Sequence, residues 1–472
     1  TQMKLSEVYS FPEEQEVRYN LLKQKVVELG FEFQTFVRAP GRVNLISEHT
    51  DYNGYQVSPI ALENDFVFAI GFKNEETPMV YINHIEEHGN DQFDPKLPLN
   101  EIAKPNKTWS MYVRAGFHAA MKYQEFSLPQ SLLLVGHGNV PLGSGLSSSS
   151  ALTCCSALSF LTIMKIPVDK VKLAAQVAKS EATVAVEGGG MDQAVSLNAV
   201  RGQVSVINFN PLRFNQIKLP DGVVVAVFSS LKDSKKATGD CNFYNTRVAE
   251  CRAGCALLLK KAGKWDNKVH MCLDVQQLLG KRSPSGMLAE VDGLPEKLTM
   301  QQLQVELGFE SLHEMLQTLF STQSGGVLIE NAAESTQLTI NSRLRHVYSE
   351  GFRAQMFERV LQTQSGDEED RLATLSKIEE LMNDSHTSCD IDYECSCKEL
   401  NEVVAEAKKC GCFCARLTGA GMGGFAVGLV HAQEAHTFFE KMKGYYVRKG
   451  VKNVEEVLFL TEAGEGASEI VL

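Results

Sequence analysis

The run Pro141-Leu-Gly-Ser-Gly-Leu-Ser-Ser-Ser-Ser-Ala151 constrains the fold most, because it joins two apolar segments of different character. Residues 131–135 upstream form a short apolar run followed by glycines, which predicts a buried strand. Residues 151–164 downstream are apolar and small over a length that suits several helical turns. The sequence therefore predicts a strand, a glycine-rich loop and a helix in direct succession.

This loop has the composition of an anion site. Gly143 and Gly145 allow a positive φ and a close approach to a ligand, and Ser147–Ser150 fall where helix N–H groups and the helix dipole attract negative charge. Hydroxyl groups there can bind phosphate oxygens or the water shell of Mg²⁺. The loop lacks both the Gly-Lys-Ser/Thr of P-loop NTPases and the G-x-G-x-x-G dinucleotide fingerprint. A phosphate cradle of another type and a plain helix-capping turn both remain open.

The composition excludes several classes of protein. The chain of 472 residues suggests two domains, with a boundary near residues 205–225. A formal net charge of −12 argues against nucleic acid as a partner. We expect no membrane partner, and a cytoplasmic location, because residues 1–7 show no secretory signal and the apolar run is too short to cross a bilayer. The twelve cysteines match neither a disulfide framework nor a zinc spacing.

A second stretch rich in polar groups follows an expected strand at residues 31–37 and a turn signal at Pro40-Gly41. Within ten residues it holds several donors and acceptors without helical or strand alternation: Arg42, Asn44, Glu48, His49 and Asp51. Such a set suits a site that fixes the hydroxyl groups of a small polar ligand. A solvated loop is the alternative.

Two further glycine-rich stretches stand out. Gly188–Gly190 place bare backbone beside the carboxylate of Asp192, either as a helix cap or as part of a tight pocket. Residues 415–424 hold four glycines and run into an apolar strand at residues 425–430. Because a strand follows, this segment is a glycine hairpin that closes on a ligand, or a simple tight turn.

Taken together, these stretches resemble the motifs of galactokinase-type sugar kinases of the GHMP kinase superfamily. The resemblance is carried by Arg42-Val-Asn-Leu-Ile-Ser-Glu-His-Thr-Asp-Tyr52, Gly145-Leu-Ser-Ser-Ser149, Gly190-Met-Asp-Gln193 and Arg416-Leu-Thr-Gly-Ala-Gly421. Their order and spacing match from about residue 33 to residue 430. Finer features, such as His346-Val-Tyr-Ser-Glu350 and Tyr393-Glu-Cys-Ser-Cys-Lys-Glu-Leu400, are similar to the branch that contains N-acetylgalactosamine kinase.

The resemblance implies a fold and an activity. The fold is α/β (α+β), with an N-terminal GHMP kinase domain over residues 1–212, a C-terminal one over residues 213–472, and the active site in the cleft between them. The activity is phosphoryl transfer from ATP, with Mg²⁺, to the anomeric hydroxyl of a galactose-type sugar, either galactose or N-acetylgalactosamine or both. A monomer is expected.

The resemblance also implies the site residues. Asp192 would be the catalytic proton acceptor, and Arg42 would hold it ionised and offset charge on the transferred phosphoryl group. The sugar would be bound by Arg42, Glu48, His49, Asp51, Gly189, Asp192 and Tyr244. The nucleotide would be bound by Trp109, Tyr112, Gly143, Ser144, Gly145, Leu146, Ser147, Ser148 and Ser149. The metal would be held by Ser149 and Glu181.

One departure and two rival functions accompany this interpretation. Ser47 stands where the family usually has glycine, and its hydroxymethyl group can strain a backbone with positive φ or crowd the sugar. We expect the protein to tolerate this serine, with some effect on substrate choice. A non-catalytic galactose and ATP sensor is the rival from another class, but such a protein should have a damaged serine loop, and Ser147–Ala151 is unbroken. Another GHMP enzyme, such as a mevalonate or homoserine kinase, is disfavoured by the Glu48–Asp51 loop.

Overall fold

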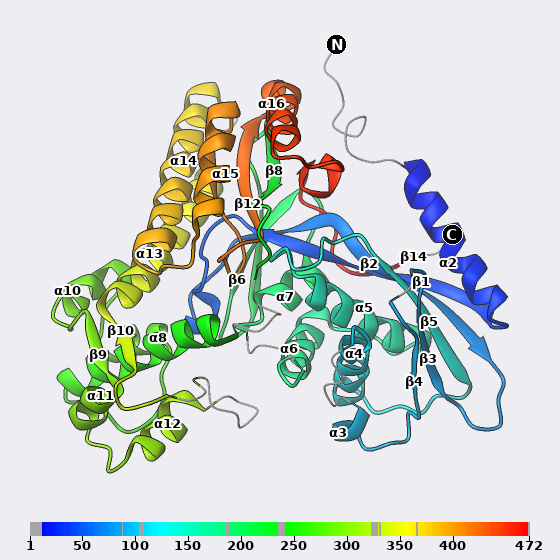
Figure 1. Cartoon of the computed structure of the whole chain (residues 1–472), viewed down its shortest axis with the longest axis horizontal. Helices are drawn as coiled ribbons and strands as arrows, with labels where there is room; N and C mark the ends of the chain where they lie inside the picture. Colours follow the sequence, from blue (N-terminus) through cyan, green and yellow to red (C-terminus); the bar gives the residue numbers. More distant parts are fainter. Residues whose placement is uncertain are drawn as a thin grey trace.

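A computed structural model describes residues 12–86, 88–102, 108–184, 188–234, 241–321, 329, 332–364 and 367–470. Its larger sheet has six strands in the order β14-β1-β2-β5-β3-β4, all antiparallel neighbours except the parallel pair β3–β5 (Figure 1). The strands are β1 (Glu32–Asn44), β2 (Pro59–Lys73), β3 (Val80–His84), β4 (Asp91–Phe93), β5 (Ser131–Gly138) and β14 (Ser468–Ile470).

Both faces of this sheet are covered, and the strand period decides which residue faces which layer. Phe68 and Ile70 of β2 pack in the cluster that contains the helix layer, whereas Val67 and Ala69 pack with Leu22 on the opposite side. The helix layer consists of α3 (Leu99–Ile102), α4 (Ser110–Tyr123), α5 (Ser148–Ile163), α6 (Lys170–Glu181) and α7 (Met191–Asn198). The opposite face carries α2 (Pro12–Glu28).

A second sheet has four strands in the order β11-β12-β8-β13 and is likewise buried on both faces. Ala226 and Phe228 of β8 lie in the larger core cluster, and Val225 and Val227 pack against the long helices on the other side. Its strands are β8 (Val223–Ser229), β11 (Cys414–Leu417), β12 (Phe425–His431) and β13 (Leu458–Thr461). The long helices here are α8 (Cys241–Lys261), α13 (Asn341–Thr363), α14 (Glu368–Ile391), α15 (Lys398–Cys410) and α16 (Ala435–Arg448).

Short elements complete the described chain. The hairpin of β6 (Gln203–Asn208) and β7 (Arg213–Lys218) lies between the two sheets in sequence. Between α8 and α13 the chain forms α9 (Cys272–Leu278), α10 (Leu288–Val291), β9 (Lys297–Thr299), α11 (Met300–Leu307), α12 (Leu312–Phe320) and β10 (Gln337–Thr339). Figure 1 shows α10, α11, α12 and the two strands in the part below α13. Single 3₁₀ turns are η1 (Asp51–Asn53), η2 (Pro284–Met287), η3 (Ala432–Glu434) and η4 (Val454–Glu456).

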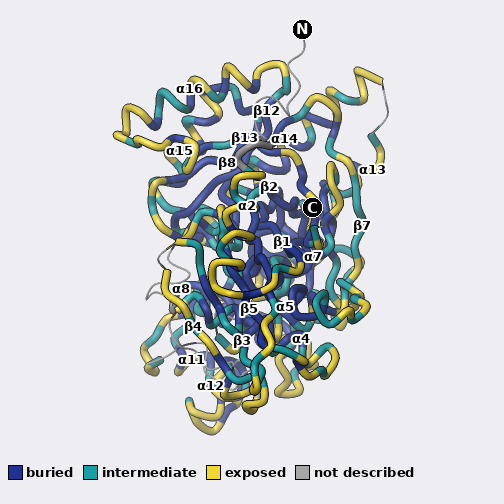
Figure 2. The backbone as a smooth tube through the Cα atoms, turned by 90° about the vertical axis from the view of Figure 1, so that its right-hand side faces the viewer, coloured by how far each residue is buried: buried dark blue, intermediate teal, exposed yellow. Residues whose placement is uncertain are grey.

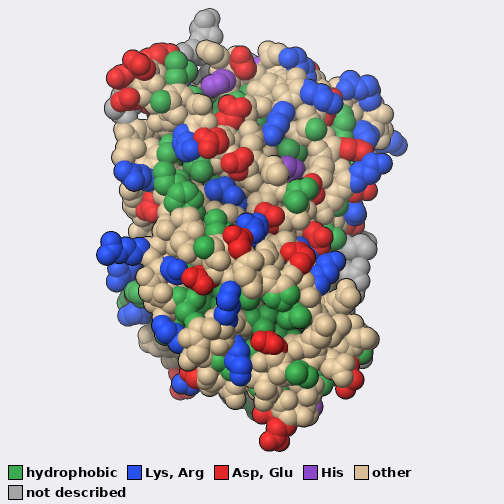
Figure 3. Space-filling model, turned by 90° about the vertical axis from the view of Figure 1, so that its left-hand side faces the viewer, with side chains coloured by type: hydrophobic (Ala, Val, Ile, Leu, Met, Phe, Trp, Pro, Cys, Tyr) green, Lys and Arg blue, Asp and Glu red, His purple; other side chains and the backbone are tan. Residues whose placement is uncertain are grey.

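The outer surface is polar and the interior sheets are buried. Figure 2 shows mainly buried residues along β1, β2 and α7, whereas buried, intermediate and exposed residues alternate along the outer helices α15 and α16. On the face shown in Figure 3, acidic and basic side chains are interspersed. Among the described residues, no helix combines the length and apolarity needed to cross a membrane.

The strand–loop–helix prediction is confirmed by β5 and α5, and the mixed α/β class by the two sheets with their helices. The division at residue 212 stays a prediction. One strand pairing joins the two predicted domains, because β14 (residues 468–470) pairs with residues 36–38 of β1.

One sequence-based boundary is wrong. The strand expected over residues 31–37 does not stop at the Pro40-Gly41 turn signal, because β1 continues to Asn44. A register shift between Pro40 and Arg42 marks a bulge, which accommodates a proline that cannot donate to the ladder. Gly41 is required there, since a Cβ at that position would lie 2.7 Å from the carbonyl oxygen of Leu146. Arg42 is therefore held in a strand and not in a loop.

A buried charge cluster ties the loop after β1 to the second sheet. Glu350 of α13 accepts hydrogen bonds from the backbone N–H of Ser47 at 2.8 Å, from Arg353 at 2.6 Å and from the Ser385 hydroxyl. Burial opposes its ionisation, but the nearby positive charges, Arg353 first, lower the pKa of this carboxyl to about 2. The neighbouring His346 is fully buried, and that burial lowers its pKa to about 4.

Acid should destabilise the protein between pH 6.5 and 4.5, partly through His346. The unfolded imidazole binds a proton near its ordinary pKa of about 6.5, whereas the folded one does so only near 4, so falling pH favours the unfolded state. Glu350 acts in the same direction only below this window, because its stabilising charge is lost as pH falls from 4.5 towards 2.

Urea unfolding at several pH values measures this effect. His346→Gln should lose about 2 kcal/mol less unfolding free energy than the parent across the window, because it removes that proton linkage. Substitution of the exposed His436 should leave the pH dependence unchanged. Parallel pH curves for His346→Gln and the parent would contradict the assignment.

Candidate active site

A cleft of about 1030 Å³ lies between the two sheets and gathers the predicted site residues. It is lined from the first sheet and its helices by the end of β1, the serine loop and the start of α7. The second half of the chain contributes Tyr244 of α8 and Gly419 and Ala420 after β11. Every predicted site residue borders it except Leu146, so the structure brings together stretches as far apart as residues 42 and 420.

An arginine–aspartate pair forms the centre of the cleft. Arg42 Nε and Nη2 both lie 2.8 Å from Asp192 Oδ1, and Arg42 Nη1 donates to the carbonyl oxygen of Gly145 at 2.6 Å. The Arg42 side chain is 3% exposed and that of Asp192 is 17% exposed, so the carboxylate remains reachable from the cleft. Asp192 lies in the first turn of α7, where the helix dipole favours a negative charge. Gly190 starts that helix with a φ of 94°.

The polar loop after β1 presents a second carboxylate to the cleft. Asp51 starts the 3₁₀ turn η1 and packs against Gly189, where a Cβ would lie 2.4 Å from the Asp51 carboxyl carbon. Gly189 is therefore required for the carboxylate to occupy this position. Tyr244 closes the same region, with its ring 5.6 Å from that of His49, and burial raises the pKa of its phenol.

Glu48 and His49 also border the cleft, but they bind protein groups. Glu48 Oε1 accepts from the backbone N–H of Gly419 at 2.8 Å and from Arg416 Nη1 at 3.3 Å. The two ring nitrogens of His49 contact the Tyr52 hydroxyl at 2.9 Å and the carbonyl oxygen of Ala420 at 3.1 Å. Both residues thus connect the polar loop to the glycine segment after β11.

The backbone of the serine-rich loop has the positive φ values that its glycines led us to expect. Gly143, Gly145 and Ser147 all have positive φ values, of 63°, 76° and 63°. The buried hydroxyl of Ser147 has no hydrogen-bond partner among the described residues, and the residue lines the cleft at the start of α5. An unpaired buried donor at a helix N-terminus is the arrangement that an anionic ligand would satisfy.

Leu146 does not line the cleft, in contrast to its predicted place among the nucleotide-binding residues. Its side chain is fully buried in an apolar cluster, and its carbonyl oxygen accepts from the backbone N–H of Arg42 at 3.1 Å. The apolar side chain turns to the core because that is the favourable environment for it. Leu146 therefore positions Arg42.

The two glycine loops pack backbone against backbone. A Cβ at Gly419 would lie 2.5 Å from the carbonyl oxygen of Gly145, and one at Gly424 would lie 2.3 Å from that of Ser144. The segment after β11 is thus a hairpin that closes over the serine loop and brings Ala420 to the cleft. The packing of this hairpin on the serine loop is thus observed, whereas its closing on a ligand stays a prediction.

The predicted metal ligands lie next to each other at one wall. Glu181, in the last turn of α6, accepts from Ser150 at 3.1 Å and from Gln193 Nε2 at 2.7 Å, and it also hydrogen bonds to Ser149. Burial raises the pKa of the Glu181 carboxyl, an effect that these donors oppose. A carboxylate and a hydroxyl facing the same cleft are oxygen donors, so the residues present fit Mg²⁺.

Aromatic side chains line another part of the cleft. Trp109 and Tyr112 line it beside Phe66 and His84, and the indole N–H of Trp109 donates to the carbonyl oxygen of Gly89 at 3.2 Å. The rings of Trp109 and His84 meet edge to face at 5.2 Å. A flat apolar group can pack against such a wall, while phosphate groups reach the serine loop.

Sequence analysis missed several residues that support the site. Arg416, which is fully buried, binds Glu48 and lies 3.9 Å from Glu350, and Gln193 orients Glu181. Arg416 and Gln193 belong to the motifs Arg416–Gly421 and Gly190–Gln193, and this membership could have identified them as site residues. The contact with Glu350 joins residues far apart in sequence, and no local pattern indicates it.

Ser47 has the conformation that the sequence comparison with the family pattern suggested. Its φ is 81°, in the left-handed region that favours glycine. Its hydroxyl is buried and without a hydrogen-bond partner among the described residues. The expected strain is therefore present, together with an unpaired polar group.

Three family models match this chain. They are described as "Galactokinase galactose-binding signature" over residues 29–72, "GHMP kinases N terminal domain" over residues 112–199 and "GHMP kinases C terminal" over residues 371–448. A galactokinase from Dictyostelium discoideum is 32% identical, covering 98% of this chain and 96% of its own length. A galactokinase from Saccharomyces cerevisiae is 31% identical, covering 83% of this chain and 81% of its own length.

Solved structures show the same fold. The galactokinase of Lactococcus lactis complexed with galactose superposes with a TM-score of 0.70 at 23% identity, covering 96% of this chain and all of that one. The mevalonate kinase of Methanococcus jannaschii gives a TM-score of 0.52 at 15% identity, covering 91% of this chain and 98% of that one. At these identities the likeness concerns the fold alone.

Replacing Ser47 should stabilise the protein. Ser47→Ala removes the unpaired buried hydroxyl, and Ser47→Gly in addition relieves the left-handed backbone, which costs a non-glycine residue roughly 1–2 kcal/mol. Part of the second gain is offset by the larger backbone entropy of glycine when unfolded. In urea titrations we expect an increase of about 1–2 kcal/mol for Ser47→Gly, and a smaller one for Ser47→Ala. A loss of stability in both variants would mean that the hydroxyl is bonded and the conformation unstrained.

Proposed function

This chain belongs to the galactokinase family of the GHMP kinase superfamily, and on that premise we propose that it phosphorylates the anomeric hydroxyl of a galactose-type sugar with ATP. The observation that carries the proposal is the Arg42–Asp192 pair, which faces the same cleft as the serine loop. A hydroxyl nucleophile needs a positioned proton acceptor, and phosphoryl transfer needs charge stabilisation beside it. This pair can supply both.

In the proposed mechanism Asp192 accepts the proton of the anomeric hydroxyl. Arg42 holds Oδ1 of that carboxylate with two of its nitrogens, which favours the ionised form of Asp192. The same guanidinium is anchored on the carbonyl oxygen of Gly145, so it lies where it can offset negative charge on the transferred group. The pair works as a rigid unit because Arg42 is in β1 and Asp192 begins α7.

The remaining residues divide between the ligands. We propose that Asp51, Glu48, His49, Gly189 and Tyr244 surround the sugar, and that Trp109 and Tyr112 pack against the base. The serine loop, from Gly143 to Ser149, would bind the phosphates with its N–H groups and hydroxyls. Ser149 and Glu181 would hold Mg²⁺, which when bound would neutralise charge on the phosphate oxygens.

The proposal also covers the oligomeric state, the location and the partners of the protein. We infer a monomer in the cytoplasm, without nucleic acid or membrane partners; the formal net charge of −12 supports the first of these exclusions. The non-catalytic sensor is not adopted, because the serine run is unbroken and starts a regular helix. The choice between galactose and N-acetylgalactosamine is left to experiment.

The central test is Asp192→Asn, which keeps the shape of the side chain and removes its basicity. We expect kcat to fall by at least ~10²-fold while sugar affinity, measured by calorimetry, is largely retained. Asp221→Asn, in an exposed turn, is the matched control and should leave kcat unchanged. Near-normal turnover of Asp192→Asn would remove Asp192 as the proton acceptor.

The sugar is identified by kcat/KM for galactose, N-acetylgalactosamine and glucose measured side by side. A site built to bind a hydroxyl rejects an analogue that cannot place it, so glucose should be at least ~10²-fold poorer than the better of the other two. The ratio between galactose and N-acetylgalactosamine then selects the substrate. A kcat/KM for glucose equal to the values for galactose and N-acetylgalactosamine would contradict a site for galactose-type sugars.

A further inference from the structure

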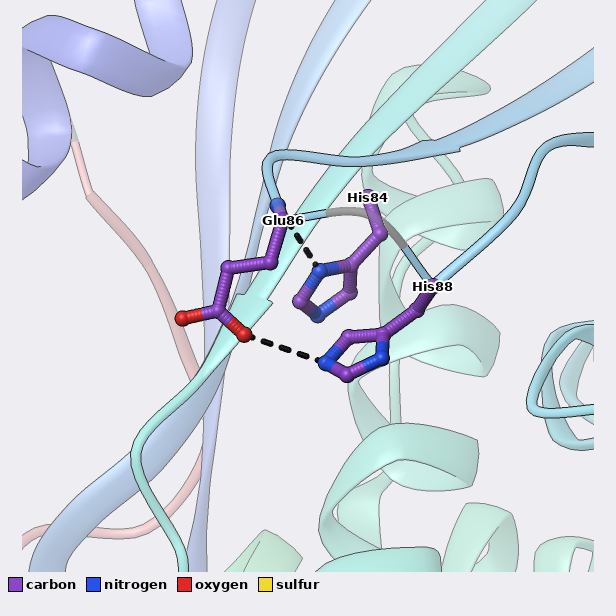
Figure 4. A group of neighbouring side chains, drawn as sticks. All are labelled: His84, Glu86 and His88. Carbon is purple, nitrogen blue, oxygen red and sulfur yellow. Dashed lines mark hydrogen bonds and ion pairs between the residues drawn. The ribbon is translucent and has the colours of Figure 1, made fainter.

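A cluster of two histidines and a glutamate lies at the aromatic end of the cleft, outside every motif assigned above. His84 is the last residue of β3, and Glu86 and His88 follow in the turn beyond it. One nitrogen or oxygen ligand atom from each residue lies within 4.8 Å of the others. Figure 4 shows the three side chains converging on one side of this turn.

The distances within the cluster suit a small cation. His88 Nε2 and Glu86 Oε2 are 3.0 Å apart and share a proton. Two ligands of a tetrahedral zinc ion, each about 2.0–2.2 Å from the metal, lie roughly 3.3 Å from one another. A cation can therefore take the place of that proton with little movement of the two side chains.

His84 supplies the third ligand by a small rearrangement. Its ring lies 4.5 Å from that of His88, and its Nδ1 accepts from the backbone N–H of Glu86 at 3.1 Å. If His84 coordinates the cation through Nε2, its ring proton moves to Nδ1. The backbone N–H of Glu86, which now donates to Nδ1, then has to turn away. Glu86 is exposed and lies beyond the end of the strand, where such a turn disturbs no ladder hydrogen bond.

A second layer of polar side chains lies next to the carboxylate of Glu86. Arg18 of α2 donates to His137 Nδ1 at 2.7 Å, which leaves the proton of the neutral His137 ring on Nε2. That Nε2 lies 3.6 Å from Glu86 Oε1, and Arg18 is itself anchored on Asp65 at 2.6 Å. Polar groups that orient ligand side chains in this way are the usual support of metal sites.

We propose that His84, Glu86 and His88 form a binding site for a divalent cation of the zinc class, with water completing the coordination. Two imidazoles and one carboxylate suit Zn²⁺, Co²⁺ or Ni²⁺, whereas Mg²⁺ prefers oxygen ligands alone. The site is separate from the oxygen ligands Ser149 and Glu181. Because all three ligands line the cleft beside Trp109, the bound cation adjoins any ligand on the aromatic wall.

Tryptophan fluorescence tests the proposal directly. The chain has two tryptophans, so Trp265→Phe leaves Trp109, next to His84, as the single emitter. In this background Co²⁺ or Ni²⁺ should quench the emission saturably, with one ion bound per chain. His88→Gln and Glu86→Gln should each weaken the quenching affinity by at least ~10-fold, since each removes one ligand.

Two controls decide whether the ion is at this site. His270 is near another carboxylate, 3.3 Å from Asp266, and His270→Gln should leave the quenching affinity unchanged. Excess Mg²⁺ should not displace the ion. The proposal is overturned if quenching is not saturable, if it is unchanged in His88→Gln and Glu86→Gln, or if Mg²⁺ competes with it.

Discussion

The Arg42 guanidinium is the interaction on which the site depends. It holds Asp192 with two nitrogens and the carbonyl oxygen of Gly145 with a third, and so fixes β1, the serine loop and the start of α7 relative to one another. A buried guanidinium is tolerated only when its donors are satisfied, and here each partner belongs to the proposed reaction centre. Stability and chemistry therefore impose the same geometry on these three segments.

A second buried arginine extends this arrangement to the other half of the molecule. Arg416 binds Glu48 and adjoins Glu350, while Gly419 donates to the same Glu48 oxygen. The polar loop is thus held by β11 and α13 as well as by its own strand. Together with the close backbone contacts of the two glycine loops, these bonds connect the two sheets across the cleft.

Local patterns predicted the parts of the protein whose conformation is set locally. The strand–loop–helix at residues 131–163 and the positive φ of Gly143 and Gly145 follow from apolar runs and glycines. The prediction was wrong at Pro40, where a bulge lets the strand continue. The side chain of Leu146 turns to the core, and the role of this residue in nucleotide binding stays a prediction. The contact of Glu350 with Ser47 joins residues that are far apart in sequence, so no sequence spacing indicates it. The cluster of His84, Glu86 and His88 is local, and its alternating spacing was a signal that sequence analysis did not use.

The pairing of β14 with β1 has a consequence for the order of folding. It joins residues 36–38 to residues 468–470, so the sheet that carries Arg42 lacks one edge strand until residues 468–470 have left the ribosome. Contacts between such distant segments close slowly, because the intervening chain must first be ordered. During synthesis, the open edge of β1 at residues 36–38 is therefore exposed to pairing with other chains.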